Sequence, residues 1–167
     1  MSIRILKLVL VVCVGLQALI YATQNLFNLD GAFGAVAYVF SMADHVAYPN
    51  RIGPAVTWAP MVWLALVVVI GGEALAGLLC LKGAFDMWRA RRRPVAGFAS
   101  AKTSAILGCG LALVVWIGFF MALGGAWFQM WQTKVGIGSL EGAFMYAVSS
   151  AVVLIFVNQP EHDQESH

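Results

Sequence analysis

Residues 59–81 read APMVWLALVVVIGGEALAGLLCL, and this stretch decides the class of fold. An α-helix needs about 20 consecutive apolar residues to cross the hydrocarbon core of a bilayer, and this stretch supplies them. Three further apolar blocks of similar length lie at residues 5–27, 104–128 and 137–157. The sequence therefore predicts an all-α integral membrane protein, a bundle of four transmembrane helices.

The composition of the whole chain leads to the same class. Of 167 residues, 61% are hydrophobic and only 11% are charged, whereas a soluble domain carries about 25% charged residues. So few charges could not cover a water-facing surface. Because no break in composition marks a boundary, we interpret residues 1–167 as one transmembrane domain.

The segments between the blocks are short. Residues 28–58 form an external loop, in which an aromatic run at 32–42 could lie in the headgroup plane as a short helix. Residues 82–103 are predicted to form a basic loop, and residues 158–167 a disordered acidic tail. The block at 5–27 has the alternative of a cleaved signal peptide, but it exceeds the 7 to 15 apolar residues of a signal core, so we interpret it as a span.

The basic residues predict the orientation. Six of the ten Lys and Arg residues lie in 82–103, Arg4 and Lys7 add two at the N-terminus, and only Arg51 and Lys134 fall on the other side. The positive-inside rule then places both termini in the cytoplasm. The cluster indicates contact with anionic lipids and does not indicate nucleic acid, with a protein-docking patch as the alternative. The arginines concerned are Arg89, Arg91, Arg92 and Arg93.

Glu73 is the acidic residue at the centre of the second span. An ionisable group inside a span is costly, usually faces the protein interior and marks a functional site by default. Helical spacing places Ile70, Ala76 and Gly77 on its face. Lys7 lies too close to the membrane edge to neutralise Glu73, so we expect the carboxyl group to be protonated and hydrogen-bonded much of the time.

Polar residues of two other spans accompany Glu73. Four form a stripe along one face of the first span, which runs from the membrane centre at Gln17 to the external edge at Asn28. Gln17 and two residues of the fourth span fall within about one helical turn of the level of Glu73. Such residues can join helices by hydrogen bonds, or they can line a pathway for protons or a small solute, and the sequence leaves both interpretations open. The candidate intramembrane site comprises Glu73, Gln17, Tyr21, Asn25, Asn28, Tyr146 and Ser149.

The sequence gives no sign of a cofactor, a metal site or catalytic residues. His45, His162 and His167 lie outside the spans, where they could not ligate a haem within the membrane. The three cysteines have no metal-binding spacing and are interpreted as apolar packing residues.

Several segments together resemble a known family. They are EALAGLLCLKGAFDMWRAR at 73–91, Ala101 with Lys102, GGAWFQMWQ at 124–132, Asn25, Asn28, and Phe40 to Met42. Together, and in their order along the chain, these segments resemble those of the bacterial predicted small integral membrane proteins with a domain of unknown function. The resemblance implies four helices in a bacterial inner membrane and assigns no activity. The chain departs from the family pattern at Ala126, where an acidic residue is common, and at 136–142, which lacks a polar stretch containing Trp.

Three functions follow as hypotheses. The first is a non-catalytic accessory or assembly subunit of an inner-membrane complex, favoured by the short connections and small-residue helix faces. The second is a small, proton-coupled transporter, possible as a homo-oligomer, that uses Glu73. The third is a membrane enzyme acting on lipid or quinone, which is supported only by Glu73 and scattered aromatic residues.

Overall fold

The computed structural model describes residues 3–48 and 50–161, and these form helices and loops without a strand. Four of its helical stretches are long and apolar enough to cross a membrane: Ile3–Phe27, Ala59–Ala90, Val95–Trp127 and Lys134–Asn158. The prediction of an all-α protein with four membrane helices is therefore confirmed. The elements in chain order are α1 (Ile3–Phe27), α2 (Leu29–Ser41), α3 (Ala59–Ala90), α4 (Val95–Ala101), α5 (Thr103–Leu113), η1 (Val114–Trp127), η2 (Met130–Gln132) and α6 (Lys134–Asn158).

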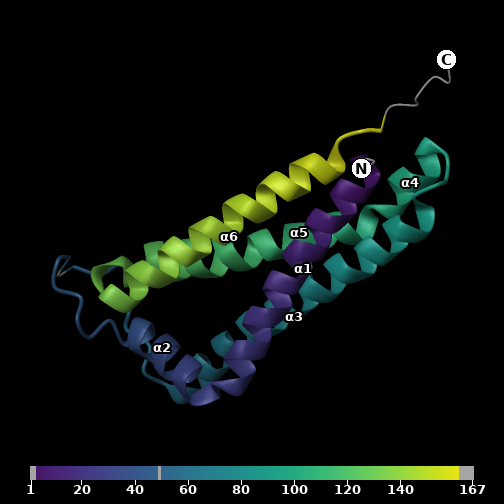
Figure 1. The fold of residues 1–167 in the computed structure, drawn as a ribbon. Coiled ribbons are helices and arrows are strands. Elements are labelled where there is room, and N and C mark those ends of the chain that lie inside the picture. Colours follow the sequence, from purple (N-terminus) through teal and green to yellow (C-terminus); the bar gives the residue numbers. More distant parts are fainter. Residues whose placement is uncertain (1–2, 49, 162–167) are drawn as a thin grey trace.

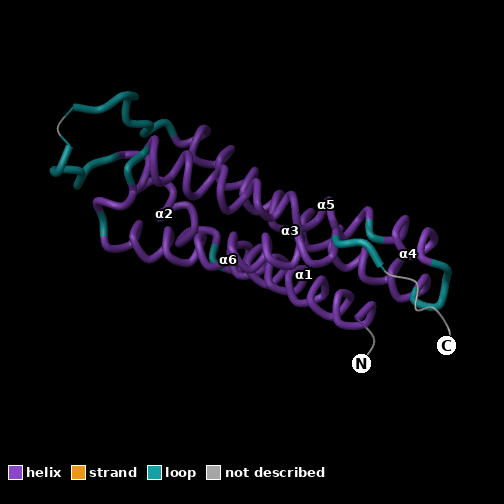
Figure 2. Tube along the Cα trace, turned by 90° about the horizontal axis from the view of Figure 1, so that it is seen from above, coloured by secondary structure: helices purple, strands orange, loops and turns teal. Residues whose placement is uncertain are grey.

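The long helices run alongside one another, with α1 against α3 and α6 against α5 and η1 (Figure 1). Both described ends of the chain lie at the same end of the bundle as α4, which we call the basic end. At the opposite end, the loop end, α2 lies across the bundle, and residues 42–48 and 50–58 extend outward from it, as the second view also shows (Figure 2).

Glycines allow the spans to approach closely. A Cβ atom on Gly108 of α5 would lie 2.6 Å from the backbone nitrogen of Cys80 in α3. A Cβ on Gly15 of α1 would lie 3.2 Å from the carbonyl oxygen of Gly77 in α3. Small residues serve this purpose where helices pack inside membranes, and here they bring both α1 and α5 close to the same part of α3, around Cys80.

The second half of the third span is a π-helix, Val114–Trp127. The turns are wider than in an α-helix, as the bond from the Phe128 amide to the Leu123 carbonyl five residues earlier shows, at 2.8 Å. The widened helix ends before Gln129, whose φ of 52° lies in the left-handed region. Turns of this kind are rare in proteins, and where they occur they often mark functional sites. The sequence did not predict them.

The basic loop predicted over 82–103 is largely helical. No proline interrupts α3 before Pro94, and Lys82 pairs with Asp86 one turn later at 2.6 Å, so α3 continues to Ala90 and α4 follows Pro94.

The aromatic run predicted at 32–42 is the helix α2, Leu29–Ser41. Its position relative to the headgroups stays a prediction.

The acidic tail also differs from the expectation of disorder where it is described. The carboxylate of Glu161 lies between the ammonium groups of Lys7 and Lys102, with its Oε1 atom 2.7 Å from each Nζ. Residues 162–167 of the predicted tail lie outside the described residues. The tail up to Glu161 thus belongs to the packed structure at the basic end.

Candidate functional site

Glu73 and Asn25 form a polar pair inside the bundle. Glu73 is only 2% exposed, and its Oε2 atom accepts a hydrogen bond from Nδ2 of Asn25 at 3.0 Å. Glu73 belongs to α3 and Asn25 to α1, and these two helices come close to each other at Gly15 and Gly77. In the described part of the chain Glu73 takes part in no ion pair. The site is thus a buried carboxyl group with one amide donor.

An aromatic cluster connects three spans through two further residues of the predicted set. The ring of Tyr21 in α1 lies 4.7 Å from that of Tyr146 in α6 and 5.9 Å from that of Trp116 in η1, between ring centroids. Trp116 also lies 5.0 Å from Tyr146, and it is buried. Aromatic pairs at such distances stabilise beyond the area they bury. Trp116 is the member that the sequence did not single out, because one more aromatic residue in an apolar span gives no signal.

In the part of the chain that the structure describes, the remaining predicted residues form no hydrogen bond to a side chain of either group. The Asn28 amide donates to the Gln24 carbonyl at 2.8 Å, and the Ser149 hydroxyl donates to the Tyr146 carbonyl at 3.0 Å. Both are exposed, and both bond only to their own helical neighbourhood. Gln17 is half-buried. The seven predicted residues therefore divide into an interhelical pair, two members of an aromatic cluster, two residues that bond locally, and Gln17.

A buried ionic cluster at the basic end was missed altogether. The ammonium groups of Lys7 and Lys102 share the Glu161 carboxylate, and each also donates to the Gln159 carbonyl at 2.9 Å. Burial alone would raise the pKa of Glu161, but the hydrogen bonds and charges of Lys102 and Lys7 outweigh it and hold this pKa below its usual value. No local pattern could reveal a contact between residues 154 positions apart.

Cys80 and Cys109 lie together in the core between α3 and α5. Both are fully buried, and their Sγ atoms are 3.9 Å apart. The prediction of apolar packing for the three cysteines fits this buried pair, whereas Cys13 is exposed. The sequence did not pair the two thiols. Over residues 3–48 and 50–161, no group of three His, Cys, Asp or Glu side chains is placed to hold a metal ion.

The family described as predicted small integral membrane protein (DUF2165) matches residues 3–160 of the chain. The chain belongs to this family. The match includes all four spans, the Glu73–Asn25 pair and the aromatic cluster, and it confirms the resemblance found in the sequence. The family description places the protein in a membrane and assigns it no activity. Neither among curated proteins nor among solved structures was a match to the chain found.

Proposed function

We propose that this protein is a non-catalytic accessory or assembly subunit of a larger membrane complex. Two glycines inside the spans carry the proposal. A Cβ atom on Gly71 of α3 or on Gly110 of α5 would meet nothing within 4 Å. Glycine costs about 1 kcal/mol in a helix relative to alanine. The packing of the chain itself therefore gives no reason for glycine at either position.

A partner helix would supply such a reason. Small residues on a helix surface allow another membrane helix to come close enough for backbone contact. Gly83 and Gly108 already have this role inside the bundle, where a Cβ would collide with neighbouring backbone atoms. Gly71 and Gly110 offer the same kind of surface, and none of the described helices lies against it. The short connections between the spans leave the membrane-facing surface as the main area for contact.

Purification in mild detergent with mass spectrometry of co-purifying proteins tests the proposal. A partner at fixed stoichiometry is expected with the tagged native chain, and it should be lost with Gly71→Leu or Gly110→Leu. Gly34→Leu is the matched control, because Gly34 of α2 also has open space around it but lies outside the four spans. A lone, monodisperse native chain would contradict the proposal.

A second candidate is a small proton-coupled transporter, favoured by the environment of Glu73. Glu73 is a buried carboxyl group with one amide donor, and among the described residues it forms no ion pair. Intramembrane carboxyl groups of this kind serve as proton-binding groups in pumps and transporters. The enclosed pair would then be one state of a cycle. In proteoliposomes, Glu73→Gln should abolish proton flux while leaving the fold intact. Glu141→Gln, at an exposed position of α6, should leave the flux unchanged.

We further infer that the membrane is a bacterial inner membrane and that the basic end faces the cytoplasm. The support is the distribution of Lys and Arg, most of which lie at the end that holds α4. A single cysteine in place of Asn50, in a chain without its native cysteines, should react with an impermeant maleimide in intact cells. A cysteine in place of Ser100 should react only after lysis, and the reverse pattern would refute this orientation.

A further inference from the structure

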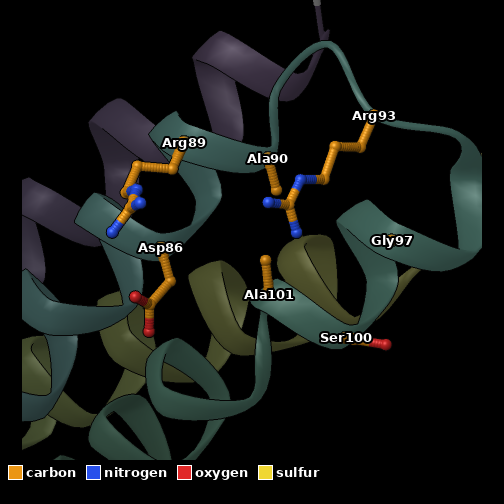
Figure 3. A pocket seen from close by; sticks show the side chains of 7 residues that line it. All are labelled: Asp86, Arg89, Ala90, Arg93, Gly97, Ser100 and Ala101. Atoms are coloured by element: carbon orange, nitrogen blue, oxygen red, sulfur yellow. The ribbon is translucent and has the colours of Figure 1, made fainter.

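A polar cleft lies at the basic end between the last turns of α3 and the short helix α4 (Figure 3). Its volume is about 420 Å³. The residues that line it include Asp86, Arg89, Arg93, Gly97 and Ala101. With 32 residues, α3 is about 48 Å long, and the hydrocarbon core is about 30 Å thick. The C-terminal turns of α3 therefore reach headgroup level or beyond.

The cleft carries two arginines that form no ion pair with a carboxylate of the described residues. Figure 3 shows the side chains of Arg89 and Arg93 on either side of Ala90, with Arg93 extending towards Ala101. The Asp86 carboxylate is already paired with Lys82 at 2.6 Å. Among residues 3–48 and 50–161, neither arginine forms an ion pair. The cleft therefore presents positive charge to whatever enters it.

The neighbouring arginines are arranged differently. The guanidinium of Arg91 donates to the Trp88 carbonyl at 2.8 Å and lies 3.9 Å from the centre of the Trp88 ring. Arg92 is exposed and does not line the cleft. The four arginines that the sequence grouped together thus separate into two that share a cleft and two that do not.

The turn that carries Arg93 is fixed in position. Arg4 of α1 donates from Nη1 to the Arg91 carbonyl at 3.1 Å and to the Arg93 carbonyl at 2.7 Å. The next residue, Pro94, has a restricted φ and is the N-cap of α4. On the other side, a Cβ on Gly97 would lie 3.2 Å from the Arg93 Cβ, so the stem of Arg93 packs closely on α4. Preorganisation of this kind lowers the cost of binding.

We propose that this cleft binds a phosphate-bearing anion between Arg89 and Arg93. Guanidinium groups match phosphate oxygens with paired, charge-assisted hydrogen bonds. The phosphate can come from an anionic lipid headgroup, given the position of the cleft beside a membrane helix, or from a soluble phosphate compound. Ser100 contributes no hydroxyl donor, because its Oγ atom already donates to the Ala96 carbonyl at 3.1 Å.

Native mass spectrometry of the full chain in detergent tests the site with two probes, phosphatidylglycerol and inorganic phosphate, and with phosphatidylcholine as the neutral lipid. The double variant Arg89→Gln/Arg93→Gln should weaken binding of the phosphate-bearing probe by about tenfold or more. Arg91→Gln/Arg92→Gln removes the same charge outside the cleft and should leave binding within about twofold. Ala101→Leu narrows the cleft without changing the charge and should also weaken binding.

The outcomes separate the sources of phosphate. Preferential binding of phosphatidylglycerol that inorganic phosphate does not displace identifies a lipid headgroup. Binding of inorganic phosphate, or displacement of the lipid by it, identifies a soluble source. Three results would overturn the site: equal losses in the two double variants, equal binding of the anionic and neutral lipids without binding of phosphate, or unchanged binding with Ala101→Leu. Size-exclusion chromatography confirms that each variant is folded.

Discussion

Asn25 and Glu73 join the first two spans by a side-chain hydrogen bond of 3.0 Å inside the bundle. The donor belongs to α1 and the acceptor to α3, which are also in contact at Gly15 and Gly77. Loss of either partner leaves the other in an apolar environment, where an unsatisfied polar group is costly. The bond therefore contributes to stability whatever the protein does.

A double-mutant cycle measures this contribution. Asn25→Leu and Glu73→Leu should each lower the free energy of unfolding in detergent, and the coupling energy between them should be about 0.6 to 1.7 kcal/mol. Thr23→Val paired with Glu73→Leu is the control, because the Thr23 hydroxyl bonds to the Leu19 carbonyl in its own helix. A coupling energy of zero for Asn25 and Glu73 would show that the bond is absent in the folded protein.

The Glu161 carboxylate is expected to stabilise the basic end in a pH-dependent manner. Glu161→Gln leaves the ammonium groups of Lys7 and Lys102 buried without their shared counter-charge, and the loss of one partner of a buried ion pair costs roughly 3 kcal/mol. The matched control is Asp86→Asn, since the exposed Lys82–Asp86 pair should be worth less than about 1 kcal/mol. Thermal unfolding followed by size-exclusion chromatography compares the two variants.

The direction of the pH effect follows from the lowered pKa of Glu161 in the folded chain. Because the folded state holds the proton less tightly than the unfolded state does, the stabilisation is present above the unfolded pKa of about 4.3. It is lost as the pH falls through the lower, folded value. Native protein should therefore lose stability in acid over this range, and Glu161→Gln should lose less. Equal losses in both would contradict the ionic cluster.

The sequence predicted those features that depend on local composition. Four apolar blocks gave four spans, and the helical period placed Glu73 on the inward face of α3 with small neighbours, because the period and the cost of burying charge act within one helix. The helix ends were less predictable. A stretch such as 82–90 suits a loop or a helix equally well; α3 includes it and ends at Ala90, four residues before Pro94.

Contacts between distant segments were beyond sequence reasoning. The stripe along the first span contains Asn25, but nothing in it shows which of its amides reaches Glu73. Three further features depend on how the helices pack. They are the pairing of Lys102 with Glu161, the contact between the thiols of Cys80 and Cys109, and the position of Arg93 in the cleft while Arg92 lies outside it. Helix periodicity supplies a face for each residue and says nothing about the level at which two helices meet.

Gly108 and Gly110 of α5 provide a matched pair for the packing of α3 against α5. A Cβ on Gly108 would lie 2.6 Å from the Cys80 nitrogen and 2.9 Å from the Ala76 carbonyl oxygen, whereas one on Gly110 would meet nothing within 4 Å. Gly108→Ala should therefore destabilise the bundle by about 1 to 3 kcal/mol through overpacking. Gly110→Ala should be neutral or stabilise by up to about 1 kcal/mol. Unfolding in detergent compares them, and equal stabilities would refute the α3–α5 register.

Cys80 and Cys109 offer a covalent test of the same register. Their Sγ atoms, 3.9 Å apart in the buried core, are close enough for a small side-chain movement to bring them to bonding distance. Mild oxidation with iodine, which enters membranes, should join them in a disulfide within one chain, and the intact mass should fall by two hydrogen atoms. Cys13→Ser should keep this product, because Cys13 is exposed on α1, while Cys80→Ser should lose it. An intrachain disulfide that persists in Cys80→Ser would mean that Cys109 lies against Cys13 instead, and that α3 and α5 do not pack at this level.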